Sequence, residues 1–204
     1  HCKLGYIPEP WKQRVAAACA GWQRSHYGWD VDPSIIRVVP DVLEAYEIFL
    51  RELVGADNSV IVPTPAYMPF LSVPKLYDVD VIEIEMLQSG DAETGEAQWV
   101  FDFDAIERAF AAGCHAFVLC NPHNPIGKVL TLEEELRLSD LAAQYDVRIF
   151  NDEIHAPFVF EGKHIPFPTI SEQAALQSMT ATSASKSFNI PGTKCAQVLL
   201  TNPA

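Results

Sequence analysis

The stretch AFVLCNPHNPIGKV, residues 116–129, decides the fold that we predict for this chain. Its first five residues are continuously apolar, and two Asn-Pro pairs and a glycine follow at once. A strand covered by helices on both faces of a mostly parallel sheet has this kind of unbroken apolar run. The prolines and the glycine then predict a rigid loop that ends the strand. We therefore expect residues 116–120 to form a central strand of such a sheet.

Outward from this stretch, short apolar runs alternate with longer amphipathic runs. The predicted strands are 59–62, 79–84, 116–120, 147–151, 178–182 and 196–200. The predicted helices are 9–24, 42–54, 66–76 with interruptions at Pro69 and Pro74, 103–112 and 132–145. Strands that alternate with helices in this way predict an α/β fold, with a doubly wound, mostly parallel sheet sandwiched by helices.

Three helix starts carry capping signals. Thr131 and Glu134 have the spacing of a capping box, in which each side chain accepts a hydrogen bond from the other residue's backbone. Asp41 and Asp102 precede two other predicted helices and are expected to cap them.

Composition excludes several classes of protein. The 204 residues are 49% hydrophobic and 20% charged, as in ordinary globular domains, and carry a formal net charge of −13. That charge argues against nucleic acid or an anionic membrane surface as the main partner. No apolar run approaches the roughly 18 residues of a membrane span. The five cysteines are odd in number and form no C-x-x-C pair, which favours reduced thiols in a cytoplasmic protein over disulfides or a zinc site.

Three loops that follow predicted strands each carry a candidate functional residue. They are Asn124 in NPHNPIGKV, Asp152 in NDEIHAPFVF and Lys186 in SASKSFNIPGTK. Taken singly, they could be a tight connection, a helix cap and a solvated lysine. In a parallel α/β sheet, however, ligands bind at the carboxyl ends of the strands. An amide, a carboxylate and an amine gathered there suit pyridoxal phosphate. The lysine forms an imine with it, the acid keeps the pyridine nitrogen protonated, and the amide donates to the phenolic oxygen.

With these motifs the chain resembles the fold-type I pyridoxal-phosphate enzymes of the aspartate aminotransferase superfamily. Within them it is most similar to the MalY/PatB group of cystathionine and cysteine-S-conjugate β-lyases. The resemblance also rests on GYIPEPWKQRVAAACAGWQRSHYGWDVDPSIIRVVPDVLEAY and VPTPAYMPF, and it extends over residues 5–196. It implies that residues 1–204 are an incomplete large cofactor domain. The N-terminal segment and the C-terminal small domain, which holds the arginine for the substrate carboxylate, are expected to lie outside it.

The resemblance assigns a role to each candidate residue. Lys186 would hold the cofactor and remove the substrate's α-proton. Asp152 would pair with the pyridinium nitrogen, Asn124 would donate to the phenolic oxygen, and Tyr67 would stack on the ring. Tyr67 could equally be an ordinary core or helix-start tyrosine.

The phosphate group and the second subunit have their own expected contacts. The backbone at Asp41 and Val42, at a helix N-terminus, would bind the phosphate together with Ser183 and Lys194. Lys194 stands where many aminotransferases carry arginine, so a point charge replaces a bidentate fork. Tyr6 would reach the phosphate of a neighbouring subunit, which implies a homodimer when the protein is complete.

His155 favours the β-lyase group, because aminotransferases commonly carry tyrosine three residues after the aspartate. The expected reaction is β-elimination from cystathionine or a related cysteine S-conjugate, which gives a thiol, pyruvate and ammonia. Two alternatives stay open: an aminotransferase with the same cofactor, and a regulatory protein that binds a transcription regulator.

Other histidines and acids have less specific surroundings. We expect no metal at Asp152, Glu153, His155 and His164, which lack a ligand spacing such as H-E-x-x-H. His26, His115 and His123 are expected to be structural or to face solvent.

Overall fold

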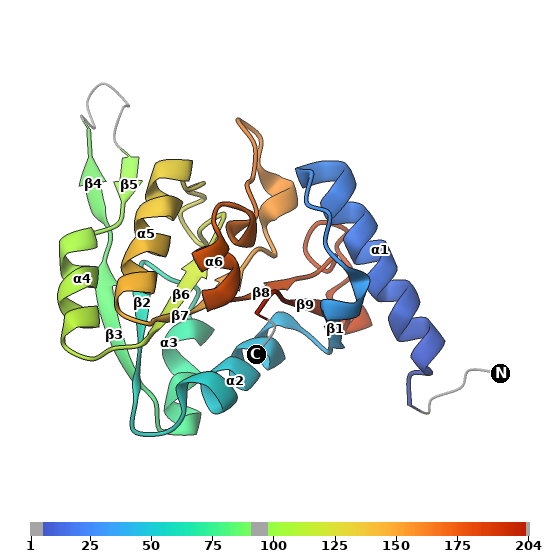
Figure 1. Cartoon of the computed structure of the whole chain (residues 1–204), viewed down its shortest axis with the longest axis horizontal. Helices are drawn as coiled ribbons and strands as arrows, with labels where there is room; N and C mark the ends of the chain where they lie inside the picture. The colour runs from blue at the N-terminus through green and yellow to red at the C-terminus, as the bar shows by residue number, and fades with distance from the viewer. Residues whose placement is uncertain (1–5, 91–97, 203–204) are drawn as a thin grey trace.

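The computed structural model describes residues 6–90 and 98–202, and a seven-stranded sheet runs through its centre (Figure 1). Across the sheet the order is β1 (Ile36–Val39), β9 (Ala196–Leu200), β8 (Ser178–Thr182), β7 (Arg148–Asp152), β6 (Ala116–Cys120), β2 (Ser59–Thr64) and β3 (Asp80–Glu85). Strands β8, β7, β6, β2 and β3 are parallel, whereas β9 is antiparallel to both of its neighbours. The predicted mostly parallel α/β sheet is confirmed.

The helices lie on both faces of this sheet. They are α1 (Glu9–Tyr27), α2 (Val42–Phe49), α3 (Pro69–Ser72), α4 (Phe103–Ala111), α5 (Leu132–Gln144) and α6 (Glu172–Gln177). A π-helical turn, Leu50–Val54, extends α2, and short 3₁₀ turns occupy Pro33–Ile35, Pro74–Tyr77, Ala156–Phe158, Phe167–Thr169 and Pro191–Thr193. A separate pair of short strands, β4 (Leu87–Ser89) and β5 (Gln98–Val100), lies at the end of the molecule opposite α1 (Figure 1).

Several elements differ from the sequence prediction. The predicted helix at 66–76 is two short turns, each starting at a proline, because proline suits the first helical position but not a helix interior. Strand β1 was not predicted, since four residues at the edge of a sheet give little periodic signal. Helix α6 was missed because its 6 residues are too few to show a helical period. The apolar run of β9 correctly indicated burial on both faces, but it carried no information on strand direction.

Capping residues begin the helices as predicted. The Thr131 Oγ1 atom accepts from the Glu134 backbone N–H at 3.2 Å, and Glu134 Oε2 accepts from the Thr131 N–H at 2.8 Å. Asp41 and Asp102 each accept a backbone N–H at 2.9 Å at the starts of α2 and α4. These bonds satisfy N–H groups that a helix leaves unpaired in its first turn.

Alternate residues of the central strands pack into opposite helical layers. Val118 of β6 belongs to a cluster with Tyr46 and Phe49 of α2. Its neighbour Phe117 belongs to a second cluster with α4 and α5, which includes Leu138. A third, smaller cluster joins α1 to β1 and β9 at one edge. The sheet is thus covered on both faces, and its strand ends are left to form a site.

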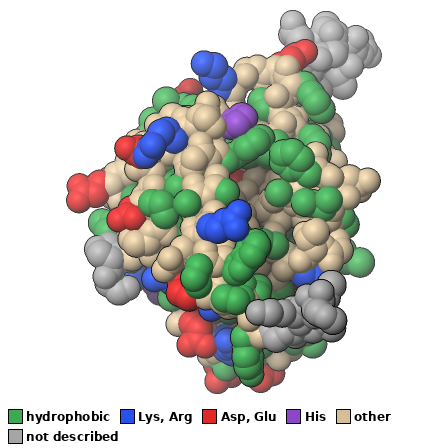
Figure 2. Space-filling model, turned by 90° about the vertical axis from the view of Figure 1, so that its right-hand side faces the viewer, with side chains coloured by type: hydrophobic (Ala, Val, Ile, Leu, Met, Phe, Trp, Pro, Cys, Tyr) green, Lys and Arg blue, Asp and Glu red, His purple; other side chains and the backbone are tan. Residues whose placement is uncertain are grey.

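The end of the molecule that carries α1 is rich in exposed apolar side chains. Figure 2 looks onto this end and shows hydrophobic side chains gathered around a hollow. An apolar groove runs between α1, which contributes Trp22, and the segment after β8, which contributes Phe188 and Ile190. Ser183 and Cys195 line both this groove and the pocket described below, so the two adjoin.

Candidate active site

One pocket, at the carboxyl ends of β7 and β8 and the N-terminus of α2, gathers the residues singled out in the sequence. All of the predicted site residues except Tyr6 line it: Asp41, Val42, Tyr67, Asn124, Asp152, His155, Ser183, Lys186 and Lys194. They come from segments far apart in the chain. The carboxyl ends of neighbouring parallel strands bring them together, as expected for a doubly wound sheet.

Asp152 is the buried acid of the pocket. It is the last residue of β7, is 5% exposed, and its Oδ1 atom accepts the Ile154 backbone N–H at 3.0 Å. Burial raises the pKa of Asp152 to about 7, and the negative charge of Glu153 adds to that effect. The Ile154 N–H and the Lys186 ammonium act in the opposite direction. A positive group placed against this carboxylate would favour its charged form.

Lys186 lies in the turn that follows β8, with its side chain at the pocket. Hydrogen bonds hold the two ends of this loop together. The Ser183 hydroxyl donates to the Cys195 carbonyl at 2.9 Å and accepts the Ser185 backbone N–H at 3.1 Å. The Lys186 charge also contributes, after burial, to the lowered pKa of His155. The loop therefore presents a cation to the two titratable groups that face it.

Asp41 and Lys194 form an ion pair at the edge of the pocket. The Lys194 Nζ atom lies 2.6 Å from Asp41 Oδ2, while Asp41 Oδ1 caps α2 by accepting the Glu44 N–H. The hydrogen bond from Lys194 lowers the pKa of Asp41, and the same contact raises the pKa of Lys194. The sequence suggested that Asp41 contributes its backbone alone. In the structure its carboxylate is engaged twice, and one of its partners is the lysine expected at a phosphate.

The aromatic and amide candidates border the same space. The Tyr67 ring packs edge-on against Phe70, with ring centroids 5.6 Å apart. Asn124 is half-buried in the loop after β6. Burial lowers the pKa of His155, so this imidazole favours its neutral form.

Tyr6 lies apart from these residues. It is fully exposed, at 102% relative exposure, and does not line the pocket. It therefore contributes nothing to the site of its own chain, and its expected contact with a second subunit stays a prediction.

Residues 10–204 match the model of the aminotransferase class I and II family. The chain belongs to this family.

Individual family members narrow the comparison. Cystathionine beta-lyase of Corynebacterium glutamicum is 37% identical over 98% of this chain and 51% of its own length. Cystathionine beta-lyase PatB of Bacillus subtilis is 30% identical over 92% of this chain and 48% of its own. The crystal structure of cystalysin from Treponema denticola, which contains a pyridoxal 5'-phosphate cofactor, superposes with a TM-score of 0.89 at 28% identity and covers 99% of this chain and 50% of its own. The present chain thus spans about half the length of these relatives.

The pocket also contains residues that the sequence reasoning missed. Ser185 lines it one residue before Lys186, and Ile154 lines it between Asp152 and His155. The alternation of small hydroxyl residues around Lys186 could have indicated Ser185. An isoleucine beside an acid gives no such signal.

The remaining histidines are structural or exposed, as predicted. The exposed ring of His26 stacks on Trp22, and that of His115 contacts the Tyr145 carbonyl. His123 is buried, and its Nε2 atom lies 2.8 Å from the Pro65 carbonyl oxygen, which ties two loops together. Within residues 6–90 and 98–202, no three histidine, cysteine or acidic side chains are grouped as metal ligands would be. No helix in the same ranges is long and apolar enough to cross a bilayer.

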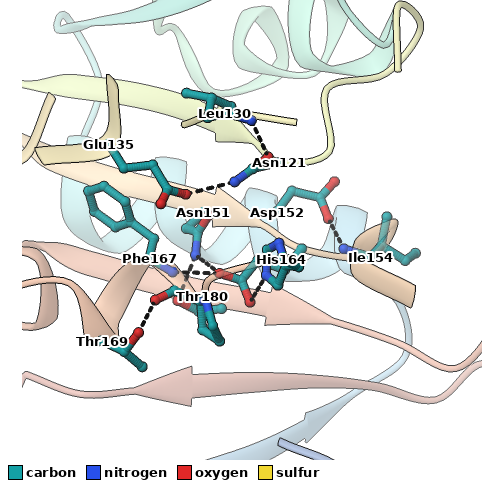
Figure 3. A network of polar contacts seen from close by, with 12 residues as sticks. Asn121, Leu130, Glu135, Asn151, Asp152, Ile154, His164, Phe167, Thr169 and Thr180 are labelled. Carbon is teal, nitrogen blue, oxygen red and sulfur yellow. Dashed lines mark hydrogen bonds and ion pairs between the residues drawn. The ribbon is translucent and has the colours of Figure 1, made fainter. Parts of the chain in front are cut away.

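A network of buried polar side chains lies behind the pocket (Figure 3). In one part of it, the Asn121 amide donates to Glu135 Oε1 at 2.7 Å and its Oδ1 atom accepts the Leu130 N–H at 3.1 Å. These bonds connect both ends of the loop that carries Asn124 to α5. Lys128 strengthens the connection through an ion pair of 2.9 Å with Glu134. The loop is therefore anchored on the first turn of α5.

Glu135 should make stability depend on pH. Burial first, and the charge of Glu153 second, raise its pKa from 4.5 to about 8. The folded state then holds a proton that the unfolded state loses, so the folded state loses stability as pH rises from about 4.5 to about 8. Glu135→Gln should remove this loss. Its stability relative to the original protein should grow with pH in that window, by up to roughly 1.4 kcal/mol per pH unit.

Urea unfolding at several pH values measures this difference. Glu133→Gln is the matched control, because it makes the same chemical change at an exposed glutamate on the same turn of α5. If the free energy of unfolding of Glu135→Gln differed from that of the original protein by the same amount at pH 5 and at pH 8, the prediction would be contradicted.

Proposed function

We propose that the complete protein is a pyridoxal-phosphate-dependent carbon–sulfur β-lyase that acts on cystathionine or a related cysteine S-conjugate. The observation that carries the proposal is the meeting of Lys186, Asp152 and Asn124 in one pocket. The family membership and the cystathionine beta-lyase names of two relatives support it. Residues 1–204 would be the large, cofactor-binding domain.

The donor set fits the cofactor. A buried carboxylate whose pKa is raised needs a cationic partner, and a protonated pyridine nitrogen is such a partner for Asp152. The N-terminus of α2 and Lys194 offer backbone N–H groups and positive charge to a phosphate. Lys186 is the amine that the pocket presents beside them. Pyridoxal phosphate, when bound, supplies an aldehyde that condenses with amines and a ring that withdraws electrons from the α-carbon.

Each side chain then has a defined task. Lys186 Nζ would take the proton from the substrate's α-carbon and is the general base of the reaction. Asp152 would stay ionised and hold the proton on the ring nitrogen by a charge-assisted hydrogen bond. The Asn124 amide would donate to the phenolic oxygen and so fix the ring's tilt. The Lys194 ammonium would contact the phosphate as well as Asp41.

His155 favours the lyase over a transaminase. It stands three residues after Asp152, where the resemblance places tyrosine in aminotransferases, and its lowered pKa keeps it neutral at the pocket. A neutral imidazole at this position adds no second positive charge beside Lys186.

The test is to incubate the complete protein with pyridoxal phosphate and cystathionine and to measure pyruvate, ammonia and free thiol. Elimination should give the three products in equal amounts without any keto acid being added. If a keto acid were required and a new amino acid formed instead, the protein would be an aminotransferase. If no pyridoxal phosphate bound at all, the proposal as a whole would fail.

The proposal includes a cytoplasmic homodimer with an amino-acid substrate. Five cysteines without a C-x-x-C pair support the compartment, and the full exposure of Tyr6 leaves it accessible to a second subunit. Analytical ultracentrifugation of the complete protein tests the dimer. A monomer with undiminished cofactor affinity would contradict the shared site.

A further inference from the structure

Glu153, the residue after Asp152, is a buried carboxylate on the far side of the strand from the pocket. It is 1% exposed and is absent from the pocket wall. Its Oε1 atom accepts two hydrogen bonds, from the Asn151 amide at 2.8 Å and from the Phe167 backbone N–H at 2.9 Å. Asn151 also donates to Thr180 Oγ1 on β8 at 3.1 Å. Glu153 therefore joins β7, β8 and the turn at Phe167. Figure 3 labels the residues around it, among them Asn151, Phe167 and Thr180.

His164 lies against the other oxygen of this carboxylate. Its Nε2 atom is 3.2 Å from Glu153 Oε2, and the His164 side chain has no exposed surface. Within the described part of the chain, neither of these two atoms has a hydrogen-bond partner, and neither has His164 Nδ1, so the contact between them is one of charge. A carboxylate and an imidazole that are both removed from water and face one another satisfy each other best as an ion pair, because an isolated buried charge is costly.

Apart from Asp152, the described groups that interact with this pair are neutral near pH 7. Glu135 of α5 senses the charge of Glu153, and its raised pKa keeps it protonated. From α1, the Tyr27 ring packs edge-on against His164 with centroids 5.1 Å apart, and Cys19 has a raised pKa caused mainly by burial, so it stays a thiol. Among these groups, His164 is the one able to balance the charge of Glu153.

Asp152, on the pocket side, is surrounded by a different set of groups. Lys186 and the neutral His155 face it in the pocket, and the Cys120 thiol of β6 is kept protonated by its burial. The charge of Glu153 reaches Asp152 from behind and disfavours its ionised form. A positive charge on His164 would offset that influence, since opposite charges at 3.2 Å present a dipole, and not a net charge, to a third group.

We propose that Glu153 and His164 form a buried ion pair behind the active site, in which His164 is a positioning residue: its positive charge offsets that of Glu153 and so keeps Asp152 in the ionised form needed to bind the cofactor's ring. The inference rests on the proposed function, because it concerns the residue that holds the ring nitrogen. The pair acts through charge as well as shape. Removing the charge of one partner should therefore shift the pKa of Asp152 in one direction, and removing the charge of the other should shift it in the opposite direction.

The affinity for pyridoxal phosphate as a function of pH gives the test. Binding to the complete protein is followed by fluorescence quenching from pH 5 to pH 9, and affinity should fall on the acid side as Asp152 takes up a proton. Glu153→Gln keeps an acceptor oxygen but removes the negative charge, so the acid midpoint should move down by about one pH unit. His164→Gln keeps a donor to Glu153 but removes the positive charge, so the midpoint should move up by a similar amount. The double variant should return close to the original midpoint.

Two controls separate charge from shape. Asn151→Ser removes a hydrogen bond to Glu153 without changing any charge, and it should lower the melting temperature without moving the midpoint. In an Asp152→Asn background the acid limb should disappear in every variant. If His164→Gln does not fold, His164→Asn makes the same change of charge and takes its place.

The outcomes are distinguishable. Shifts of the same sign in both single variants, or no shift in Glu153→Gln, would show that the pair is merely structural. If the original protein bound no pyridoxal phosphate, the proposed function would fail first. Binding with midpoints that do not move would refute this inference alone.

Discussion

Lys186→Ala in the complete protein is expected to abolish turnover, with a loss of about 10⁴-fold, the upper end of what a positioned general base contributes. Among the residues that the structure describes, the one other amine lining the pocket is Lys194, which is held by Asp41. The variant should also lack the visible absorbance band that a lysine–cofactor imine gives and that borohydride removes. Pyruvate release and the absorbance spectrum measure the two effects.

A matched control and a rescue sharpen this test. Lys75→Ala removes an exposed lysine from the turn Pro74–Tyr77, outside the pocket, and should leave turnover and spectrum unchanged. A small primary amine such as methylamine should restore part of the turnover of Lys186→Ala, which would not occur if the variant had simply lost its fold. An absorbance band that persists unchanged in Lys186→Ala would show that the imine forms on a different residue.

Asp152→Asn is expected to lower turnover by at least roughly a hundredfold, the scale that follows loss of one strong electrostatic stabiliser. The amide introduced at this position would keep an oxygen for the Ile154 N–H, so the local shape should persist. The variant would lose the negative charge that holds a proton on the ring nitrogen. Steady-state kinetics at saturating cofactor separate this effect from weaker binding.

Asp102→Asn supplies the control for that substitution. Asp102 also accepts a backbone N–H, at the start of α4, and lies outside the pocket. Asparagine caps helices about as well as aspartate, so this variant should keep its turnover and stability. Near-normal turnover of Asp152→Asn with cofactor bound would overturn the role given to Asp152.

The sequence predicted those parts of the fold and site that depend on local patterns. The apolar run 116–120 identified a strand covered on both faces, and the capping residues marked three helix starts. The rule that ligands gather at strand ends singled out Asn124, Asp152 and Lys186, and the family resemblance added the other six candidates that line the same pocket. Each of these inferences uses residues within a few positions of one another.

What the sequence could not predict depends on contacts between distant segments. Asp41 and Lys194 are 153 positions apart, and nothing near either residue indicates that they pair. In the sequence, Glu153 and His164 were considered only as members of a metal site, which their spacing does not support. Their meaning as a buried pair became apparent only when the fold placed His164 against the strand that carries Asp152. Burial makes the ionisation of one charged residue depend on that of its neighbours. Which residues are buried together is set by the packing of the whole molecule.

The reversed direction of β9 has a mechanical consequence for the lysine loop. Thr182 at the end of β8 lies opposite Gln197 near the start of β9, so the loop leaves the sheet and returns to it at neighbouring points. Its span is closed like a hairpin and does not cross to the other edge of the sheet. Because both ends of the loop are fixed by the sheet, the number of residues in the loop sets how far Lys186 extends. Substitutions within this loop change its chemistry, whereas an insertion or deletion would move the Lys186 amine toward or away from the pocket.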